Sequence, residues 1–331
     1  TAPYEVHESL PDRFVQALQA LAADMAAFYA DEPANADAAL QGLYFDVLYF
    51  LRLAELQGPH ALCDLTLQGA SAVSPADAVL CVRNVVPAPM LKDRWSAAQA
   101  VTLFSATLSP PGFLVDMLGL PADTAWVDVP SAFVPSRLDV RVARNISTRY
   151  PDRERSLPSL VRLMSQQFAR APGNYLAFFS SFDYMHMAAN AMQAAQPCVP
   201  LWLQSRGMSE ADRGAFLGRF TLHSQGIGFA VLGGAFGEGI DLPGARLIGA
   251  FIATLGMPQV NPVNEQIRQR MQACVGHGYD YTYLFPGIQK VVQAAGRVIR
   301  TPQDLGVVFL MDDRFARPDV LALLPAWWQV R

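Results

Sequence analysis

The segment GFAVLGGAFGEGIDLPG, residues 228–244, joins a short apolar stretch to a loop of glycines and acidic residues. Residues 228–232 have the composition of a buried strand. The loop that follows contains five glycines and one proline. This composition is typical of a tight turn at a strand end, which offers carboxylates and backbone N–H groups to a ligand or a neighbouring arginine. The spacing does not match the G-x-G-x-x-G dinucleotide fingerprint, and a purely structural turn explains the composition equally well.

Short apolar segments alternate with helical ones on both sides of this loop. We expect strands at residues 138–142, 175–179, 228–232, 247–252 and 307–311. We expect helices at residues 157–171, 183–194, 210–220, 261–273 and 288–299. Strands that alternate with helices predict an α/β fold, in which a parallel sheet is flanked by helices on both faces.

The first third of the chain has a different pattern and is expected to be mainly helical. Apolar residues recur at three- and four-residue spacing in residues 9–28, and a second helix is expected at residues 36–56. Residues 78–82 and 100–104 have the composition of single strands. Prolines and glycines cluster between residues 109 and 135, where we expect a domain boundary.

Composition describes an ordered globular chain and excludes several classes of protein. Of 331 residues, 52% are hydrophobic and 16% are charged, and the longest apolar runs fall short of the roughly 20 residues of a membrane span. The four cysteines lie far apart without a C-x-x-C pair, which predicts reduced thiols of the cytoplasm and no metal site. Because the net charge is −4, nucleic acid would have to bind in a local groove. The opening Thr-Ala-Pro-Tyr suggests a piece of a longer protein.

The segment QAAGRVIR, residues 293–300, has the strongest chemical signal. On a helix, Gln293, Arg297 and Arg300 project from one face because they are separated by four and three residues. Arginine's planar fork matches a phosphate, and no carboxylate alternates with these side chains. A solvated basic face with arginines paired to distant acids is an equally good interpretation of the spacing.

Residues 175–184 form an apolar strand followed by two hydroxyls and several aromatic residues. Ser180 and Ser181 are candidates for contacts with a phosphate backbone, and Tyr184 is a candidate for stacking on a base. Serines in this position more often cap the next helix.

Five phrases occur in the order typical of one helicase family: SATLSP, FFSSFDYM, GGAFGEGIDLPG, PQVNPVNEQIRQR and QAAGRVIRTPQDLGVVFLMDDRF. Over residues 101–315 the chain therefore resembles the superfamily-two helicases of the XPD/DinG branch. The resemblance implies a RecA-like second motor domain at residues 136–331 and a motif-three strand with a linker at residues 100–135. Residues 1–99 are expected to be the end of a helical arch and of the first motor domain.

The resemblance also implies roles for individual residues. Gln293, Arg297 and Arg300 match the motif that reaches the phosphates of ATP, where an arginine finger stabilises the transition state. The glycine-rich loop matches the motif that couples ATP to DNA, through Glu238, Gly239 and Asp241. The residues that match DNA-binding or coupling motifs are Ser105, Thr107, Ser180, Ser181 and Tyr184. Residues 204–206 match a polar loop of the family.

The chain lacks the other half of an ATP site. A P-loop needs Gly-Lys followed by Ser or Thr, yet Lys92 and Lys290, the only lysines, follow leucine and glutamine. The acidic residues at 31–32 have no preceding buried strand. We therefore expect ATP and Mg²⁺ to be cofactors of a full-length protein, no iron-sulfur ligands here, and an inactive fragment.

The resemblance implies movement along single-stranded DNA in the 5′ to 3′ direction, which is the direction in which the family moves. The implied partners are that DNA and a missing N-terminal motor domain of the same protein, with no membrane and a cytoplasmic or, in a bacterium, nucleoid location. A binding module for single-stranded nucleic acid with a degenerate nucleotide site is the alternative, and a nucleotide-sugar transferase is a third. The retained Gln293, Arg297 and Arg300 favour the motor, because a binding module needs no arginine finger.

Overall fold

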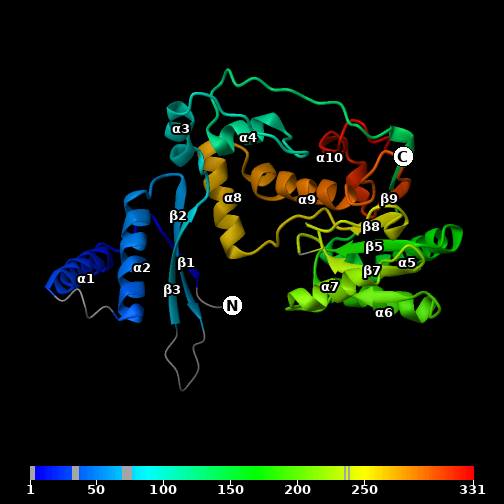
Figure 1. Cartoon of the computed structure of the whole chain (residues 1–331), viewed down its shortest axis with the longest axis horizontal. Helices are drawn as coiled ribbons and strands as arrows, with labels where there is room; N and C mark the ends of the chain where they lie inside the picture. Colours follow the sequence, from blue (N-terminus) through cyan, green and yellow to red (C-terminus); the bar gives the residue numbers. More distant parts are fainter. Residues whose placement is uncertain (1–3, 32–36, 69–76, 235, 238) are drawn as a thin grey trace. The chain divides into compact units, whose positions relative to one another are not determined.

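The computed structural model describes residues 4–31, 37–68, 77–234, 236–237 and 239–331 (Figure 1). The chain divides into two compact units. The first comprises residues 1–103, 112–124 and 259–282, and the second comprises residues 104–111, 125–258 and 283–331.

The first unit is mainly helical, as expected, and also contains an antiparallel sheet. Its main helices are α1 (Asp12–Asp31), α2 (Ala38–Glu55), α3 (Ala88–Ala97), α4 (Pro111–Leu118) and α8 (Pro262–Val275). The sheet has the order β1-β2-β3, formed by β1 (Tyr4–His7), β2 (Ala61–Gln68) and β3 (Asp77–Asn84). Only part of β3 was expected from the sequence. β2 was missed because Asp64 interrupts its apolar pattern, although Asp64 is buried and accepts hydrogen bonds from Arg83.

The strand expected at residues 100–104 is absent from the structure. These residues are exposed and have no regular secondary structure, and the Phe104 side chain is 90% exposed. The prediction was wrong for this segment because an apolar stretch becomes a strand only beside a strand that can share its hydrogen bonds. Among the described residues, no strand pairs with it.

The second unit is built on a six-stranded sheet with the order β4-β9-β8-β5-β7-β6 (Figure 1). All its pairs are parallel. The strands are β4 (Leu138–Val142), β5 (Asn174–Phe179), β6 (Leu201–Leu203), β7 (Gly226–Val231), β8 (Gly249–Ala253) and β9 (Gly306–Leu310). The α/β fold with a parallel sheet is confirmed. β6 was not expected, since three residues are too few for a recognisable pattern.

Helices cover both faces of this sheet because successive strand residues point to opposite sides. In β5, Tyr175, Ala177 and Phe179 pack with α5 (Arg153–Arg170) and α6 (Phe182–Ala195). Leu176 and Phe178 point to the opposite face. That face is covered by α7 (Glu210–Gly218), α9 (Phe285–Ala295) and α10 (Pro318–Leu321).

The chain that leads into α9 is helical, and the end of α9 corrects one expectation. The alternation of aromatic residues from Tyr279 to Phe285 has the period of a strand, but Asp280–Leu284 is a π-helical turn that leads into α9. Tyr281, Leu284 and Ile288 are buried, and their spacing is helical. The expected helix at residues 288–299 ends at Ala295 instead, so the last arginines of the motif follow the helix.

Candidate nucleotide-facing site

Arg297 and Arg300 converge on a single backbone atom of the glycine-rich loop. Arg297 Nη1 donates to the carbonyl oxygen of Ile240 at 3.0 Å. Arg300 Nη2 donates to the same oxygen at 2.8 Å. The expectation that both arginines share a helix face with Gln293 is therefore corrected. Gln293 lies on the last turn of α9, whereas the chain after Ala295 turns and brings both guanidinium groups to the loop.

Arg300 also forms an ion pair with Asp241, whose Oδ1 lies 3.2 Å from Arg300 Nε. The Arg300 side chain is 32% exposed and that of Asp241 is 74% exposed. Because an exposed ion pair contributes only about 0–1 kcal/mol, an anionic ligand can replace Asp241 at small cost. Arg300 is thus held in place and remains reachable from solvent.

Asp304 fixes the backbone around Arg300 and was missed by sequence reasoning. Its Oδ2 accepts hydrogen bonds from the N–H groups of Arg300 and Thr301, each at 2.8 Å, and its Oδ1 accepts from the Thr301 hydroxyl at 2.7 Å. Burial acts to raise the pKa of Asp304, but these bonds and one from the Gly244 N–H hold it below its usual value. Since Gly244 belongs to the glycine-rich loop, Asp304 joins this loop to the arginine segment. The signal was an aspartate in a short turn between a helix and a strand.

The glycine-rich loop follows β7 and bends at glycines with positive φ. Gly233 has φ +82° and Gly239 has φ +73°, a region that other residues rarely adopt. The aliphatic part of Lys290, on α9, lies against Gly233, because a Cβ built there would come within 3.3 Å of Lys290 Cδ. Gly239 is exposed, and Glu238, the acidic residue expected to couple ATP to DNA, lies outside the described residues.

The polar loop at residues 204–206 supports the start of the glycine-rich loop. Gln204 is buried, and its Oε1 accepts a hydrogen bond from the N–H of Val231, the last residue of β7, at 2.8 Å. Arg206 pairs with Asp183 at 3.1 Å and lies over the Phe182 ring at 4.6 Å. Gln204 therefore has a positional role that its sequence motif alone did not specify.

The residues that follow β5 form hydrogen bonds within the protein. Ser180 Oγ accepts from Arg153 Nη2 at 2.9 Å, and Ser181 caps α6 by accepting from the N–H of Tyr184 at 3.2 Å. Tyr184 is fully buried, its ring packs against Phe179, and the Arg153 guanidinium lies over it at 4.8 Å. Burial raises the pKa of the Tyr184 hydroxyl to about 12. Its ring has no exposed face on which a base can stack.

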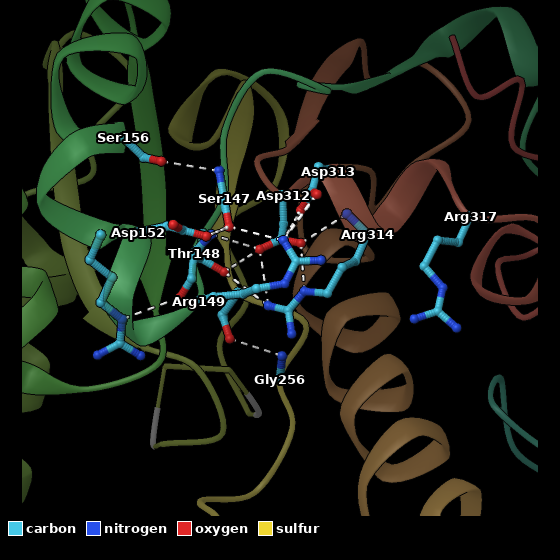
Figure 2. Close-up of polar contacts among 12 residues, drawn as sticks. Ser147, Thr148, Arg149, Asp152, Ser156, Gly256, Asp312, Asp313, Arg314 and Arg317 are labelled. Carbon is cyan, nitrogen blue, oxygen red and sulfur yellow. Dashed lines mark hydrogen bonds and ion pairs between the residues drawn. The ribbon is translucent and has the colours of Figure 1, made fainter.

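A buried network connects the ends of β4 and β9 (Figure 2). The fully buried Asp312 accepts from the hydroxyl of Thr148 and, at 2.8 Å, from its N–H. Arg314 donates to Asp312 through Nε at 2.7 Å and Nη2 at 3.0 Å. Burial acts to raise the pKa of Asp312, but Arg314 and Thr148 hold it below its usual value. Arg153 Nε donates to the Thr148 carbonyl at 3.2 Å, which extends the network to Ser180.

Ser105 and Thr107 lie beside α9. Their hydroxyl oxygens are 3.3 Å apart, and the Thr107 carbonyl accepts from Gln289 Nε2 at 3.4 Å. In the described part of the chain, neither residue hydrogen-bonds to Arg297 or Arg300. Within the same part, no group of three or more metal-ligating side chains is present, and no helix is long and apolar enough to cross a membrane.

A family model described as "Helicase C-terminal domain" matches residues 164–331, just over half of the chain. The chain belongs to this helicase family. The match contains the glycine-rich loop, both converging arginines and Asp304. The resemblance to the XPD/DinG branch is confirmed by this match together with the similar proteins described next.

This chain is 28% identical over 265 residues to the ATP-dependent helicase DinG of Mycobacterium tuberculosis, and the alignment covers 77% of this chain and 39% of that protein. It is 24% identical over 273 residues to the ATP-dependent DNA helicase chl-1 of Caenorhabditis elegans, covering 73% of this chain and 31% of that protein. The chain thus spans less than half the length of these relatives. The structure also aligns with a solved XPD helicase, with a TM-score of 0.61 and 16% sequence identity. The alignment covers 97% of this chain and 56% of the XPD chain, which shows a common fold.

Proposed function

We propose that this chain is the C-terminal part of an ATP-dependent DNA helicase and supplies the arginine-bearing half of its ATP site. The observation that carries the proposal is the convergence of Arg297 and Arg300 on the Ile240 carbonyl, with Arg300 still reachable from solvent. Residues 136–331 would form the second motor domain, residues 100–135 the linker, and residues 1–99 the end of the arch and of the first motor domain. The ATP-dependent helicase relatives support this assignment.

The donors of this chain fit the phosphates of ATP from one side. Arg300 exchanges its exposed carboxylate partner for a phosphate oxygen and neutralises charge that develops as the terminal phosphoryl group is transferred. Arg297 and Asp304 keep the Arg300 segment in register with the loop. Bound ATP with Mg²⁺ supplies the hydrolysable phosphoanhydride. The P-loop and the magnesium ligands would come from the N-terminal motor domain, since no Gly-Lys pair occurs in this chain.

The helicase would convert hydrolysis into movement along single-stranded DNA in the 5′ to 3′ direction. Asp241 and the glycine-rich loop connect the arginines to β7, and Gln204 connects the same strand end to the polar loop. A change at the nucleotide can therefore shift the loops at the carboxyl edge of the sheet, where ligands of open α/β sheets bind. Tyr184 takes no direct part in this contact, while Ser105, Thr107, Ser180 and Ser181 remain candidates.

A binding module for single-stranded nucleic acid with a degenerate nucleotide site is the second candidate. The exposed Arg300–Asp241 pair is the observation that fits it, because an arginine paired with its own loop needs no nucleotide. The two candidates differ in what the arginines do, and substitution of these residues separates them.

The test uses the full-length protein with Arg300→Ala, Arg297→Ala and, as a matched control, Arg219→Ala. Arg219 is exposed at the end of α7 and carries the same charge. We expect kcat for DNA-stimulated ATP hydrolysis to fall about a thousandfold in Arg300→Ala, the loss typical of an arginine finger. Arg297→Ala should also reduce kcat, and Arg219→Ala should not. Affinity for single-stranded DNA should be retained. DNA binding by the full-length protein without measurable ATP hydrolysis would favour the binding module, and an unchanged kcat in Arg300→Ala would contradict the role proposed for Arg300.

A further inference from the structure

A cavity of about 370 Å³ lies beside the buried network, at the ends of β4 and β9. The side chains that matter for its chemistry are those of Arg144, Ser147, Arg155, Ser156, Ser159 and Asp313. They come from the connection between β4 and α5, from the first two turns of α5 and from the residues after β9. Figure 2 labels Ser147, Ser156 and Asp313 among them. None of them belongs to the arginine and glycine-rich segments described above.

Two serine hydroxyls of α5 still have a hydrogen to donate. Ser156 Oγ accepts from the N–H of Ser147 at 3.1 Å, and Ser159 Oγ accepts from Arg162 Nη2 at 3.3 Å. Among the described residues, neither hydroxyl donates to a protein acceptor. A hydroxyl carries one donor besides its acceptor sites. A ligand that accepts hydrogen bonds therefore suits this cavity better than a ligand that donates them.

The charges around the cavity also favour an anion. Arg144 is exposed and has no ion pair with a carboxylate in the described part of the chain. Arg155 pairs with Asp152 at 2.8 Å. The Asp313 carboxylate, which forms part of the wall, accepts from Arg149 through both oxygens at 2.7 and 3.0 Å. Of the charged residues that line the cavity, Arg144 and Arg155 carry two positive charges and Asp313 carries one negative charge, so one positive charge is left over.

We propose that this cavity binds a phosphate group through Arg144, Arg155 and the hydroxyls of Ser156 and Ser159. Arginine and hydroxyl donors match the tetrahedral arrangement of phosphate oxygens, and the cavity lies at the carboxyl edge of a parallel sheet, where ligands bind. The phosphate belongs either to the backbone of a nucleic-acid strand or to a small free phosphate compound. The first source rests on the proposed function, whereas the second does not.

Binding is measured on the 331-residue chain with two probes, inorganic phosphate and a short fluorescent oligothymidylate. Phosphate is followed by calorimetry and by the amide NMR signals of α5, and the oligothymidylate by anisotropy at several salt concentrations. The variants are Arg144→Ala and Ser159→Ala. The control is Arg170→Ala, which removes an exposed arginine from the opposite end of the same helix.

We expect inorganic phosphate to shift the amide signals of Ser156 and Ser159, and Arg144→Ala to weaken this binding about tenfold, the loss of one charged hydrogen-bonding partner. Ser159→Ala should weaken it less, and Arg170→Ala should leave it unchanged. If the ligand is a nucleic-acid backbone, Arg144→Ala should also lower the slope of log affinity against log salt by about 0.7, one phosphate contact to a single strand.

The outcomes separate the two proposals. Phosphate binding that depends on Arg144, without oligothymidylate binding, supports the cavity and assigns it to a small phosphate compound. This outcome does not bear on the proposed motor, whose test is ATP hydrolysis by the full-length protein. Oligothymidylate binding that Arg144→Ala and Arg170→Ala weaken equally reflects general charge. Inorganic phosphate binding that Arg144→Ala weakens no more than Arg170→Ala, or an absence of phosphate shifts in α5, overturns the cavity proposal. Circular dichroism of each variant excludes unfolding as the cause.

Discussion

The carboxylate of Asp312 carries a full charge inside the protein and is stable there because its hydrogen bonds come from two separate segments. Thr148 donates from the chain after β4, and Arg314 donates from the turn after β9. A buried charge of this kind costs several kcal/mol unless a partner and further hydrogen bonds compensate. Asp312 thereby links the two strand ends that border the cavity.

Replacement of Asp312 by Asn should destabilise the protein strongly. The variant leaves the Arg314 guanidinium, 16% exposed, without its carboxylate, and loss of one member of a buried pair costs about 3 kcal/mol or more. Urea unfolding followed by tryptophan fluorescence measures the change in the free energy of unfolding. Asp319→Asn, which removes an exposed partner of Arg317, is the control and should have little effect. Equal effects of the two variants would contradict a structural role for the buried network.

Stability should decrease in acid because of Asp312 and Asp304. Both carboxyl groups have a pKa below the ordinary 3.8 in the folded protein. The unfolded chain therefore binds more protons than the native one as pH falls past about 4, so the stabilisation is present above that pH and is lost through the folded pKa values. Unfolding titrations between neutral pH and pH 2 measure this loss, and Asp312→Asn should make the slope shallower. If the free energy of unfolding of Asp312→Asn depends on pH with the same slope as that of the unsubstituted chain, the lowered pKa of Asp312 does not cause the acid sensitivity.

The sequence identified Arg297 and Arg300 but not the contact that brings them together. Their convergence depends on the end of α9 at Ala295 and on the Ile240 carbonyl, a backbone atom that no side-chain pattern reveals. Asp304 was missed for a similar reason, since its partners are backbone N–H groups. The roles of these residues in ATP chemistry stay predictions.

At the scale of the elements, β7 shows how closely the helices pack on the sheet. Gly228 lies in the middle of this strand, and a Cβ built there would come within 2.5 Å of Phe220 Cζ and 3.1 Å of Leu176 Cδ2. Both neighbours are fully buried and cannot move away into solvent. The glycine is therefore required by the packing of the chain after α7 against the strand that leads to the glycine-rich loop.

Gly228→Ala should lower the free energy of unfolding by about 1–3 kcal/mol, the usual cost of overpacking a core. Gly214→Ala is the matched control in the neighbouring helix α7, where a Cβ has no heavy atom within 4 Å. It should raise the stability by up to about 1 kcal/mol, because alanine favours a helix over glycine. Thermal and urea unfolding of both variants test the contrast. A stable Gly228→Ala chain would mean that the helices pack less closely than described.

Periodicity predicted the elements well where an apolar pattern was long and local. The strands of the large sheet that were expected coincide with β4, β5, β7, β8 and β9 to within two residues, in line with the uncertainty of element ends. The three-residue β6, and β2, whose apolar pattern is interrupted by Asp64, were beyond the reach of such patterns. Residues 100–104 have the composition of a strand but lack a partner, which is a property of the surroundings and not of the segment itself.

For the molecule as a whole, the absence of a Gly-Lys pair means that these 331 residues contain no P-loop to hold the phosphates of ATP. We expect the purified chain to hydrolyse ATP no faster than buffer, with or without single-stranded DNA, because the phosphate cradle and the magnesium ligand supply much of the catalysis. Release of phosphate from ATP measures this. The full-length protein is the positive control. Measurable DNA-stimulated hydrolysis by the purified chain would contradict a split site.

In the proposed motor, the ion pair between Arg300 and Asp241 would matter between one ATP turnover and the next. Without a counter-ion, the Arg300 guanidinium would be repelled by neighbouring positive charges and would bind other anions from solution when no nucleotide is present. Asp241 directly follows Ile240 in the chain and occupies the Arg300 guanidinium in the structure. In the proposed cycle, an incoming phosphate would displace Asp241, and Asp241 would return when the product leaves. The nucleotide-free and nucleotide-bound states of the proposed motor would then differ little in charge around the guanidinium, so neither state would be strongly favoured.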